Sequence, residues 1–316
     1  MDASSFPWKR GCECIPFRLL VVGVLLTLVL AVPRARAADF SATPTEGTAP
    51  LTVDFTDLSA GSPTAWTWYF GDEDLSGPWM QVTGAAQWAG RQVHAAVVLS
   101  DGSLVVMGGA LGYLVYEDDV WCSTNGGATW TLKSSSAWPE RAAHAAVALS
   151  DGSMVVMGGQ GAGTLNDVWR STNQGTSWTQ QTGAASWTAR RSFAAVALPD
   201  DTIVLMGGYD STSVEKNDVW RSTDQGATWT QMTAAAPWSA RCYHSAVALA
   251  DGSIVLMGGD DGSIRRDVWR STDQGATWTE MTSAAGWTQG IDSAAVVLPD
   301  GKIVRMGGAS PETNSV

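Results

Sequence analysis

The fold is decided by one copy of a repeat, RCYHSAVALADGSIVLMGG at residues 241–259 followed by DVWRSTDQGATWTEMTSAAGW at residues 267–287. This copy holds short segments rich in β-forming residues: HSAVAL, SIVLMGG, DVWRST and TWTEMT. Asp-Gly between the first two predicts a tight hairpin turn, and Asp-Gln-Gly between the last two predicts another, because glycine supplies the positive φ. Helical periodicity is absent, which excludes a helical repeat.

The same pattern recurs along the chain with a period of about 50 residues. Its landmarks are a methionine before paired glycines, the tryptophan that ends STDQGATW, and a tryptophan further on. They recur at Met107, Met157, Met206, Met257 and Met306; at Trp130, Trp178, Trp229 and Trp278; and at Trp88, Trp138, Trp187, Trp238 and Trp287. A fixed period of this size is typical of solenoids and propellers, and four antiparallel strands make one propeller blade. The sequence therefore predicts an all-β fold, a β-propeller of four-stranded blades.

The composition supports a packed domain. The chain has 316 residues, of which 45% are hydrophobic and 16% are charged, so there is ample material for a core and disorder is excluded. Thirteen of the 17 tryptophans occupy three repeated positions, so we expect most of them to pack between blades. The formal net charge of −12 argues against nucleic-acid binding, which requires clustered lysine and arginine.

The N-terminal residues predict export. Lys9, Arg10 and Arg18 precede an apolar run at residues 19–32, and Ala-Arg-Ala follows at residues 35–37. This is the pattern of a secretory signal peptide, with cleavage after Ala37. The apolar run would span roughly 21 Å as a helix, which is short of the hydrocarbon core, so a retained membrane anchor is the alternative. We therefore expect a secreted or cell-surface protein.

Cysteine usage does not predict a disulfide framework. Cys12 and Cys14 would be removed with the signal peptide, which leaves Cys122 and Cys242 at positions that are not equivalent in the repeat. Pairing needs Cα atoms within about 7 Å, so we expect two free, packed thiols.

Two repeat families share these motifs. The pattern R-x-x-H, an apolar strand, Gly-Gly, and a later strand ending in tryptophan resembles the kelch repeat. The segments 123–130, 171–178, 222–229 and 271–278 resemble the Asp-box (BNR) pattern S-x-D/N-x-G-x-x-W. Both resemblances imply a β-propeller.

An upstream segment, residues 39–74, resembles the front half of a PKD domain, an immunoglobulin-like sandwich, through its W-x-W-x-F-G-D stretch. We expect residues 40–57 to form a small β extension and residues 66–70 to dock into the propeller. The expected organisation is a signal peptide at 1–37, a PKD-like β extension at 38–61 and a propeller at 62–316. The propeller is expected to have five blades and to be closed by strands from both chain ends, because closure pairs open sheet edges.

The most regular motifs are expected to be structural. Side chains of the Asp-box turns, Asn125, Asn173, Asp224 and Asp273, are expected to bond local backbone amides. His94, His144 and His244 occupy one repeat position, and a ring of imidazoles could bind a metal. Phe193 and Ser293 interrupt that series, which favours packed, hydrogen-bonded histidines. No metal or cofactor is predicted.

Residues that differ between otherwise equal copies are the better candidates for recognition, because they could distinguish an asymmetric ligand. The loops between the second and third strands vary throughout, and we expect them to share one face with the arginines that precede each first strand. The candidate ligand-binding residues are Arg91, Arg141, Arg190, Arg241, Tyr113, Tyr116, Glu117, Asp118, Tyr209, Asp210, Glu215, Lys216, Asp260, Asp261, Arg265 and Arg266. Solvated loops without a function are the alternative reading.

Three functions fit the sequence. The leading hypothesis is an exported or surface propeller that binds an extracellular glycan or protein through its variable loops, without catalysis and without nucleic acid. It would meet a membrane only through an uncleaved signal anchor. The second is a sialidase-like glycan hydrolase, which the Asp-box resemblance implies; that activity needs an arginine cluster and a Tyr/Glu pair. The third is a structural component of an envelope or matrix.

Overall fold

The computed structural model describes residues 18–21, 40–43, 51–57, 81–112, 114–287 and 291–308. Every regular element in these ranges is a β-strand. None of the described residues forms a helix of the length and hydrophobicity that crossing a membrane requires. The chain divides into two compact units, Met1–Gly77 and Pro78–Val316.

The first unit contains a small antiparallel sheet in the order β1-β3-β2. Its strands are β1 (Arg18–Val21), β2 (Phe40–Thr43) and β3 (Leu51–Asp57). Phe40 pairs with Asp57 and Thr43 with Asp54, in the segment where the sequence predicts a β extension. Arg18 also pairs with Asp54 on the other edge of β3, so β1 belongs to the same sheet.

The second unit contains four antiparallel sheets of four strands, which we call blades 1 to 4. Blade 1 consists of β4 (Ala95–Val98), β5 (Leu104–Gly112), β6 (Val115–Ser123) and β7 (Thr131–Ser134). Blade 2 consists of β8 (Ala145–Ala148), β9 (Met154–Gln160), β10 (Thr164–Ser171) and β11 (Thr179–Thr182). Blade 3 consists of β13 (Ala194–Ala197), β14 (Ile203–Met206), β16 (Val219–Ser222) and β17 (Thr230–Thr233). Blade 4 consists of β18 (Ser245–Ala248), β19 (Ile254–Met257), β20 (Val268–Ser271) and β21 (Thr279–Thr282).

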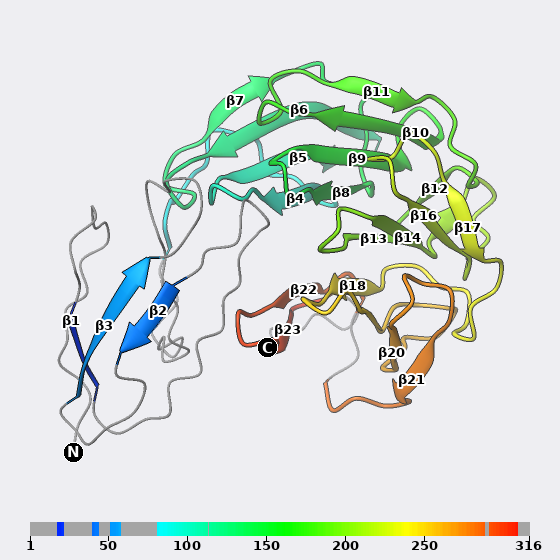
Figure 1. Cartoon of the computed structure of the whole chain (residues 1–316). Coiled ribbons are helices and arrows are strands. Elements are labelled where there is room, and N and C mark those ends of the chain that lie inside the picture. Colours follow the sequence, from blue (N-terminus) through cyan, green and yellow to red (C-terminus); the bar gives the residue numbers. More distant parts are fainter. Residues whose placement is uncertain are drawn as a thin grey trace. The chain divides into compact units, whose positions relative to one another are not determined.

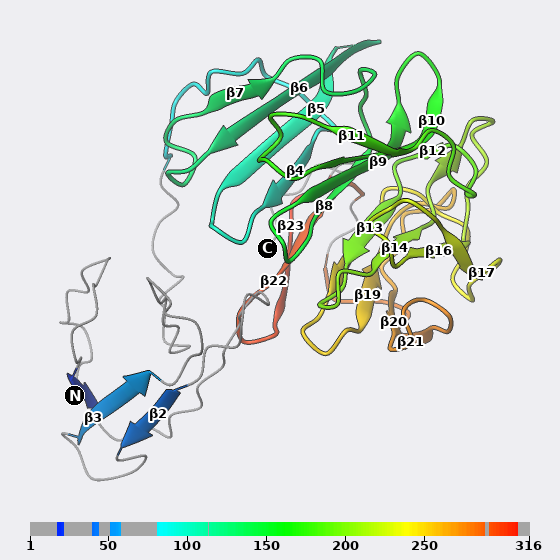
Figure 2. The same cartoon turned by 45° about the horizontal axis from the view of Figure 1, so that its top comes forward.

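A fifth repeat contributes two described strands, β22 (Ala294–Val297) and β23 (Ile303–Met306), which pair with each other. The first strands of successive sheets lie side by side: β4 contacts β8, β8 contacts β13, β13 contacts β18 and β18 contacts β22. The sheets follow one another around a curve in chain order (Figures 1 and 2). The predicted all-β propeller of four-stranded blades is confirmed. Two segments are expected to complete the fifth blade: residues 66–70, and the segment from Trp79 towards Trp88. The first lies outside the described residues, and the described part of the second, residues 81–88, forms no strand.

The apolar core lies between the blades. Alternate residues of each first strand point to opposite neighbours, as the two-residue period of a strand requires. In β8, Ala145 and Val147 pack against blade 3, whereas Ala146 and Ala148 pack against blade 1. Each of blades 2 to 4 therefore shares its hydrophobic faces with the repeat before it and the repeat after it.

Paired glycines lie within or directly after each second strand, and in blades 1 to 3 an aromatic ring of the next blade occupies the space beside them. Gly158 and Gly159 both have positive φ, which favours glycine. A Cβ on Gly158 would lie 2.9 Å from the ring of Phe193 in blade 3, and one on Gly159 would lie 2.7 Å from the Cβ of His144 in its own blade. The glycine pair thus makes room for a ring from each of two blades.

Four turns build the opposite end of blades 1 to 4; we call them Asp-box turns only for their resemblance to that sequence pattern. In the turn of blade 3, Ser222 Oγ donates to Asp224 Oδ1 at 2.8 Å and accepts from the Gly226 amide at 2.9 Å. Trp229 Nε1 donates to the Gly226 carbonyl oxygen at 3.1 Å. The same bonds recur in the turns at 123–130, 171–178 and 271–278. These side chains therefore serve local turn structure, as the sequence predicts.

The repeated tryptophans pack in pairs. Trp138 meets Trp178 edge to face with ring centroids 4.3 Å apart. Equivalent edge-to-face pairs are Trp88 with Trp130, Trp187 with Trp229 and Trp238 with Trp278, at 5.8–5.9 Å. The Nε1 atoms of Trp121, Trp169, Trp220 and Trp269 instead donate to aspartates two residues earlier. The tryptophan excess is a feature of packing.

Candidate binding face

The loop between the second and third strands and the linker before the first strand pair with each other in each blade. Backbone bridges join Gln92 with Ala110, Ala142 with Gln160, and Cys242 with Asp260. In blade 3 the same contact is a short sheet, β12 (Arg190–Arg191) with β15 (Tyr209–Asp210). We call the surface formed by these linkers and loops the variable face. The predicted grouping of linkers with loops is correct in every blade from 1 to 4.

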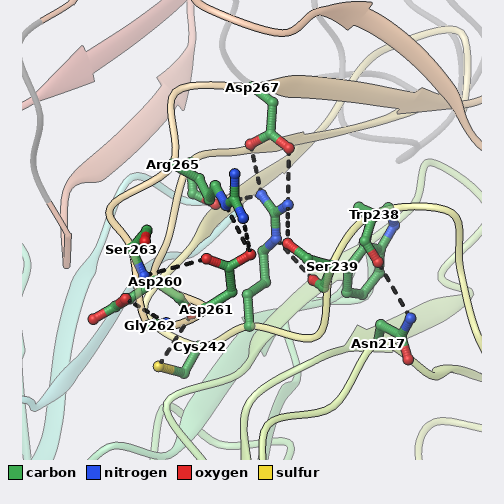
Figure 3. Close-up of polar contacts among 12 residues, drawn as sticks. Asn217, Trp238, Ser239, Cys242, Asp260, Asp261, Gly262, Ser263, Arg265 and Asp267 are labelled. Carbon is green, nitrogen blue, oxygen red and sulfur yellow. Dashed lines mark hydrogen bonds and ion pairs between the residues drawn. The ribbon is translucent and has the colours of Figure 1, made fainter.

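The four candidate arginines are buried beneath this face. Arg241 donates to both carboxylate oxygens of Asp267, at 2.6 and 2.8 Å, and to the Gly258 carbonyl oxygen at 2.8 Å (Figure 3). Equivalent two-point ion pairs join Arg91 to Asp119, Arg141 to Asp167 and Arg190 to Asp218. Burial alone would raise the pKa of Asp218 and Asp267, but the arginines hold both pKa values below the usual range.

These ion pairs leave the arginines little exposed surface and few free hydrogen-bond donors for a ligand. Arg141 and Arg190 have no exposed surface, and their guanidinium groups already bond to protein acceptors. A bound carboxylate would have to displace a buried aspartate, which is costly. The arginine cluster that the sialidase alternative requires is therefore not available from these four side chains. Their geometry supports a structural role within each blade.

A line of backbone hydrogen bonds runs across the variable face from blade to blade. The amides of Ala143, Ser192, Tyr243 and Asp292 each donate to the carbonyl oxygen of the equivalent residue one repeat earlier, at 2.8–3.1 Å. All of these residues, and Val93 at the start of the line, adopt positive φ between 48° and 55°. The backbone geometry is constant while the side chains are valine, alanine, serine, tyrosine and aspartate. The fold thus holds five chemically different side chains at equivalent places.

An aromatic cluster lies where blades 2, 3 and 4 meet on this face. Tyr209 and Tyr243 meet edge to face with ring centroids 5.8 Å apart. The guanidinium of Arg191 lies 5.7 Å from the Tyr209 ring centre and donates to Gln160 Oε1 at 3.0 Å. Tyr209 also hydrogen-bonds the buried thiol of Cys242, which raises the pKa of the tyrosine. The positions equivalent to Tyr243 carry valine, alanine, serine and aspartate, so this pair of tyrosine rings has no copy elsewhere among the described residues.

Acidic groups surround the cluster. Burial and the nearby Asp260 and Asp261 raise the pKa of Glu215. Burial alone raises the pKa of Asp292 to about 6. Burial also raises the pKa of the Cys242 thiol to about 12, so this cysteine is a packed thiol and not a nucleophile. The cluster therefore combines two aromatic rings and one cation with poorly compensated carboxylates.

Several predicted loop residues pair within their own loop. Asp210 and Lys216 form an ion pair of 2.7 Å, and Asp261 accepts from Arg265 Nε at 2.7 Å (Figure 3). These pairs shape the loops of blades 3 and 4. Arg266 is exposed on the same loop.

Blade 1 carries the remaining candidates. Tyr116, Glu117 and Asp118 lie on β6 and are partly buried, while Tyr113 lies outside the described residues. Glu117 pairs with Gly109 and Tyr116 with Ala110 across the hairpin. These three residues therefore lie on the variable face but are separated in the fold from the aromatic cluster.

Sequence reasoning missed three residues inside the linkers and one, Gln160, at the end of β9. Gln160, Arg191, Tyr243 and Asp292 belong to the described site and were not among the candidates. The sequence does contain a pattern that could have identified the linker residues: the positions after each arginine differ between copies just as the loop positions do. Only the backbone bridges show that these positions share one surface.

Two of the three histidines are packed, although without the hydrogen bonds that the sequence predicts. His144 and His244 are buried with neither ring nitrogen hydrogen-bonded, whereas His94 is exposed. Burial and the adjacent arginines lower the pKa of both buried histidines to about 3. Phe193 fills the same place in blade 3, so the ring and not its nitrogens is what the position needs. Within the described ranges, no cluster of three or more His, Cys, Asp or Glu side chains is arranged for a metal ion.

Comparison with known proteins agrees with the geometry. None of the curated proteins matches the chain. The family model of the KLHDC2/KLHL20/DRC7 Kelch-repeats domain matches residues 93–308, which is more than half of the chain. This range contains the buried Arg–Asp pairs of blades 2 to 4, the paired glycines and the bridged linkers described above. The chain belongs to the KLHDC2/KLHL20/DRC7 kelch-repeat family.

Proposed function

We propose that the chain is an exported binding protein that recognises a protein partner through its variable face. A kelch-repeat domain is a protein-binding propeller module, and the chain carries one over residues 93–308. The observation that carries the choice of face is the contrast between repeated and varied residues. The repeated charged side chains are satisfied internally, whereas the varied ones gather at the linkers and loops.

The aromatic cluster, which lies beside the blade 3 linker, is a part of the variable face suited to recognition of a protein partner. Tyrosine and arginine are enriched at the energetic centres of protein interfaces, because they combine large contact area with directional polar groups. Tyr209, Tyr243 and Arg191 are partly exposed and already hold one another in place. Such preorganisation lowers the entropy cost of binding.

Binding can be tested with the full chain against two kinds of probe, a displayed library of short peptides and a glycan array. We expect peptide binders whose affinity falls at least about tenfold in Tyr243→Ala, since such a loss corresponds to one well-placed interface side chain. Ala143 occupies the equivalent backbone position, so alanine is tolerated there, and Glu280→Gln on exposed β21 is the control variant. Two results would contradict the proposal. One is binding to glycans and to no peptide; the other is peptide binding that neither Tyr243→Ala nor any other substitution on the variable face weakens.

Export is the second part of the proposal, and it rests on the signal pattern of residues 1–37. We expect the full-length chain, expressed with its own N-terminus in a secreting host, to appear in the medium beginning at Ala38. N-terminal sequencing checks this. Retention of an intact N-terminus in the membrane fraction would show that the segment serves as an anchor.

A further inference from the structure

The hairpin of blade 1 continues further past the paired glycines than its counterparts do; in blade 2 the pairing stops one residue after them, at Gln160 with Thr164. Strands β5 and β6 continue to pair beyond the paired glycines, up to Gly112 with Val115. In blades 3 and 4 the second strands end at Met206 and Met257, before those glycines. Propeller packing therefore does not require the longer hairpin. We call the exposed side chains at its end, Leu111, Leu114 and Val115, the hairpin tip.

The hairpin tip is apolar and exposed. Leu111 is 41% exposed, Leu114 is 63% exposed and Val115 is 51% exposed. Leu114 also adopts positive φ, 58°, a conformation that a leucine in a turn seldom takes. The corresponding loops of blades 2 and 4 begin with Gly-Ala-Gly and Asp-Gly-Ser instead. Large aliphatic side chains grouped at an exposed tip are typical of a surface that another molecule covers.

The base of the hairpin carries three consecutive carboxylates, Glu117, Asp118 and Asp119, and Arg91 lowers the pKa of Glu117 only enough to offset part of their repulsion. Burial raises the pKa of Glu117, and Asp119 and Asp118 raise it further. The pKa of Asp118 is also raised, by burial and by the charges of Asp119 and Glu140. Arg91, the nearby cation, is committed to its two-point ion pair with Asp119. A positive group placed here from outside would relieve this repulsion.

The fold does not need this charge. Asn166 and Asn217 stand at the position of Asp118 in blades 2 and 3, and each donates through its amide to two carbonyl oxygens of the following linker. A carboxylate cannot donate these bonds. Asp118 therefore replaces a structural asparagine with a charge that is not used in packing.

We propose that the hairpin tip anchors a segment of a partner protein in which large apolar side chains lie next to lysine or arginine. The apolar residues would cover Leu111, Leu114 and Val115, and the cation would face Glu117 and Asp118. This proposal rests on the proposed function and names the partner chemistry of one part of the variable face. A lipid surface is disfavoured, because the acidic base of the hairpin would repel anionic headgroups.

The test selects short linear peptides from a displayed random library on the full chain, then measures synthetic copies by fluorescence anisotropy. We expect selected peptides to combine large apolar residues with lysine or arginine. Leu114→Ser combined with Val115→Ser should weaken their binding at least about tenfold, because two apolar contacts are lost. Asp118→Asn, which restores the residue of blades 2 and 3, should weaken binding and reduce its dependence on salt.

Leu132→Ser provides the matched control. Leu132 is similarly exposed, but it lies on β7 of the same blade, outside the hairpin, so binding should not change. A peptide copy with glutamate in place of its lysines and arginines should not bind. Flotation with phosphatidylcholine and phosphatidylserine vesicles is the lipid arm, and tip-dependent flotation would overturn the proposal.

The remaining outcomes separate this proposal from the proposed function. A selection in which binding peptides need Tyr243 and none of them needs Leu114 or Val115 would overturn the hairpin proposal and leave the proposed function standing. Selected peptides that are acidic or uncharged would also overturn the hairpin proposal. Failure to select any binder, or binding that no variable-face variant affects, would count against both.

Discussion

The two ends of each blade obey different rules. At the Asp-box turns, the same serine, asparagine or aspartate, glycine and tryptophan form the same bonds in every blade from 1 to 4. At the variable face, the backbone is equally regular, with one left-handed residue per repeat, but the side chains differ from copy to copy. Packing between identical blades demands identical residues, whereas recognition of an asymmetric partner demands different ones. Regular residues in a repeat protein therefore indicate the fold, and irregular residues on a regular backbone indicate the candidate site.

The buried ion pairs are the strongest test of this division, since they lie directly beneath the variable face but repeat in every blade from 1 to 4. Asp167→Ala should lower the free energy of unfolding by about 3–5 kcal/mol, because it leaves the buried Arg141 charge without a partner. Chemical denaturation measures this. The comparison variant is Asp261→Ala, which removes the loop ion pair with the exposed Arg265. It should lower the free energy of unfolding by about 1 kcal/mol or less. Equal losses in the two variants would show that the arginines are not the structural elements we describe.

The turn glycines test the other end of the blade. In Gly226→Ala, the new Cβ would lie 2.6 Å from Val168 Cγ1 of the preceding blade, at a φ of +92°. We expect a loss of about 2–4 kcal/mol in unfolding free energy, from the backbone conformation and the overlap together. Gly252→Ala has a similar φ, +83°, and no atom within 4 Å, so it should cost only the backbone part, about 1–2 kcal/mol. If both variants lost the same stability, contact between the turn and the preceding blade would not matter.

The buried histidines predict an acid-sensitive stability. Their folded pKa of about 3 lies below the ordinary 6.5, so the unfolded chain takes up protons first and stability falls as pH drops from about 6.5 towards 3. At pH 5 each histidine should cost about 2 kcal/mol relative to pH 8. His244→Phe introduces the residue type that blade 3 has at Phe193. It should remove the part of the stability loss that His244 causes, as measured by denaturation at pH 5 and pH 8. An unchanged pH dependence in the double variant His144→Phe/His244→Phe would contradict this account.

Asp292 predicts the smallest effect, because its side chain is exposed and solvent screens much of the energy of its pKa shift. Its pKa of about 6 exceeds the ordinary 3.8, so ionisation destabilises the folded state above pH 4, and this penalty is complete above pH 6. Asp292→Asn should therefore raise the melting temperature slightly at pH 8 and leave it unchanged at pH 3. Carboxyl NMR titration of the unmodified chain checks the pKa directly. A pKa near 4 would indicate that the side chain is well solvated and not held in the site.

Much of the fold follows from the sequence, since each strand, turn and glycine pair repeats with a clear local reason. The Asp-box turns form because Ser222 and Asp224 bond backbone amides a few residues away, and such short-range chemistry is readable from spacing alone. The roles of the arginines were harder to foresee. Arg141 and Asp167 lie 26 residues apart, and nothing in their spacing tells a buried ion pair from a ligand-binding cation.

The sequence by itself determined the strand pattern, the repeat, the kelch resemblance and the positions that vary, because these depend on local chemistry and on comparison between copies. Tertiary structure alone decided which varied residues meet. Tyr209 and Tyr243 come from different repeats and touch only because the linker of each blade crosses to the loop beside it. Exposure was likewise decided by packing: the arginines became buried supports, while Leu111, Leu114 and Val115 stayed exposed.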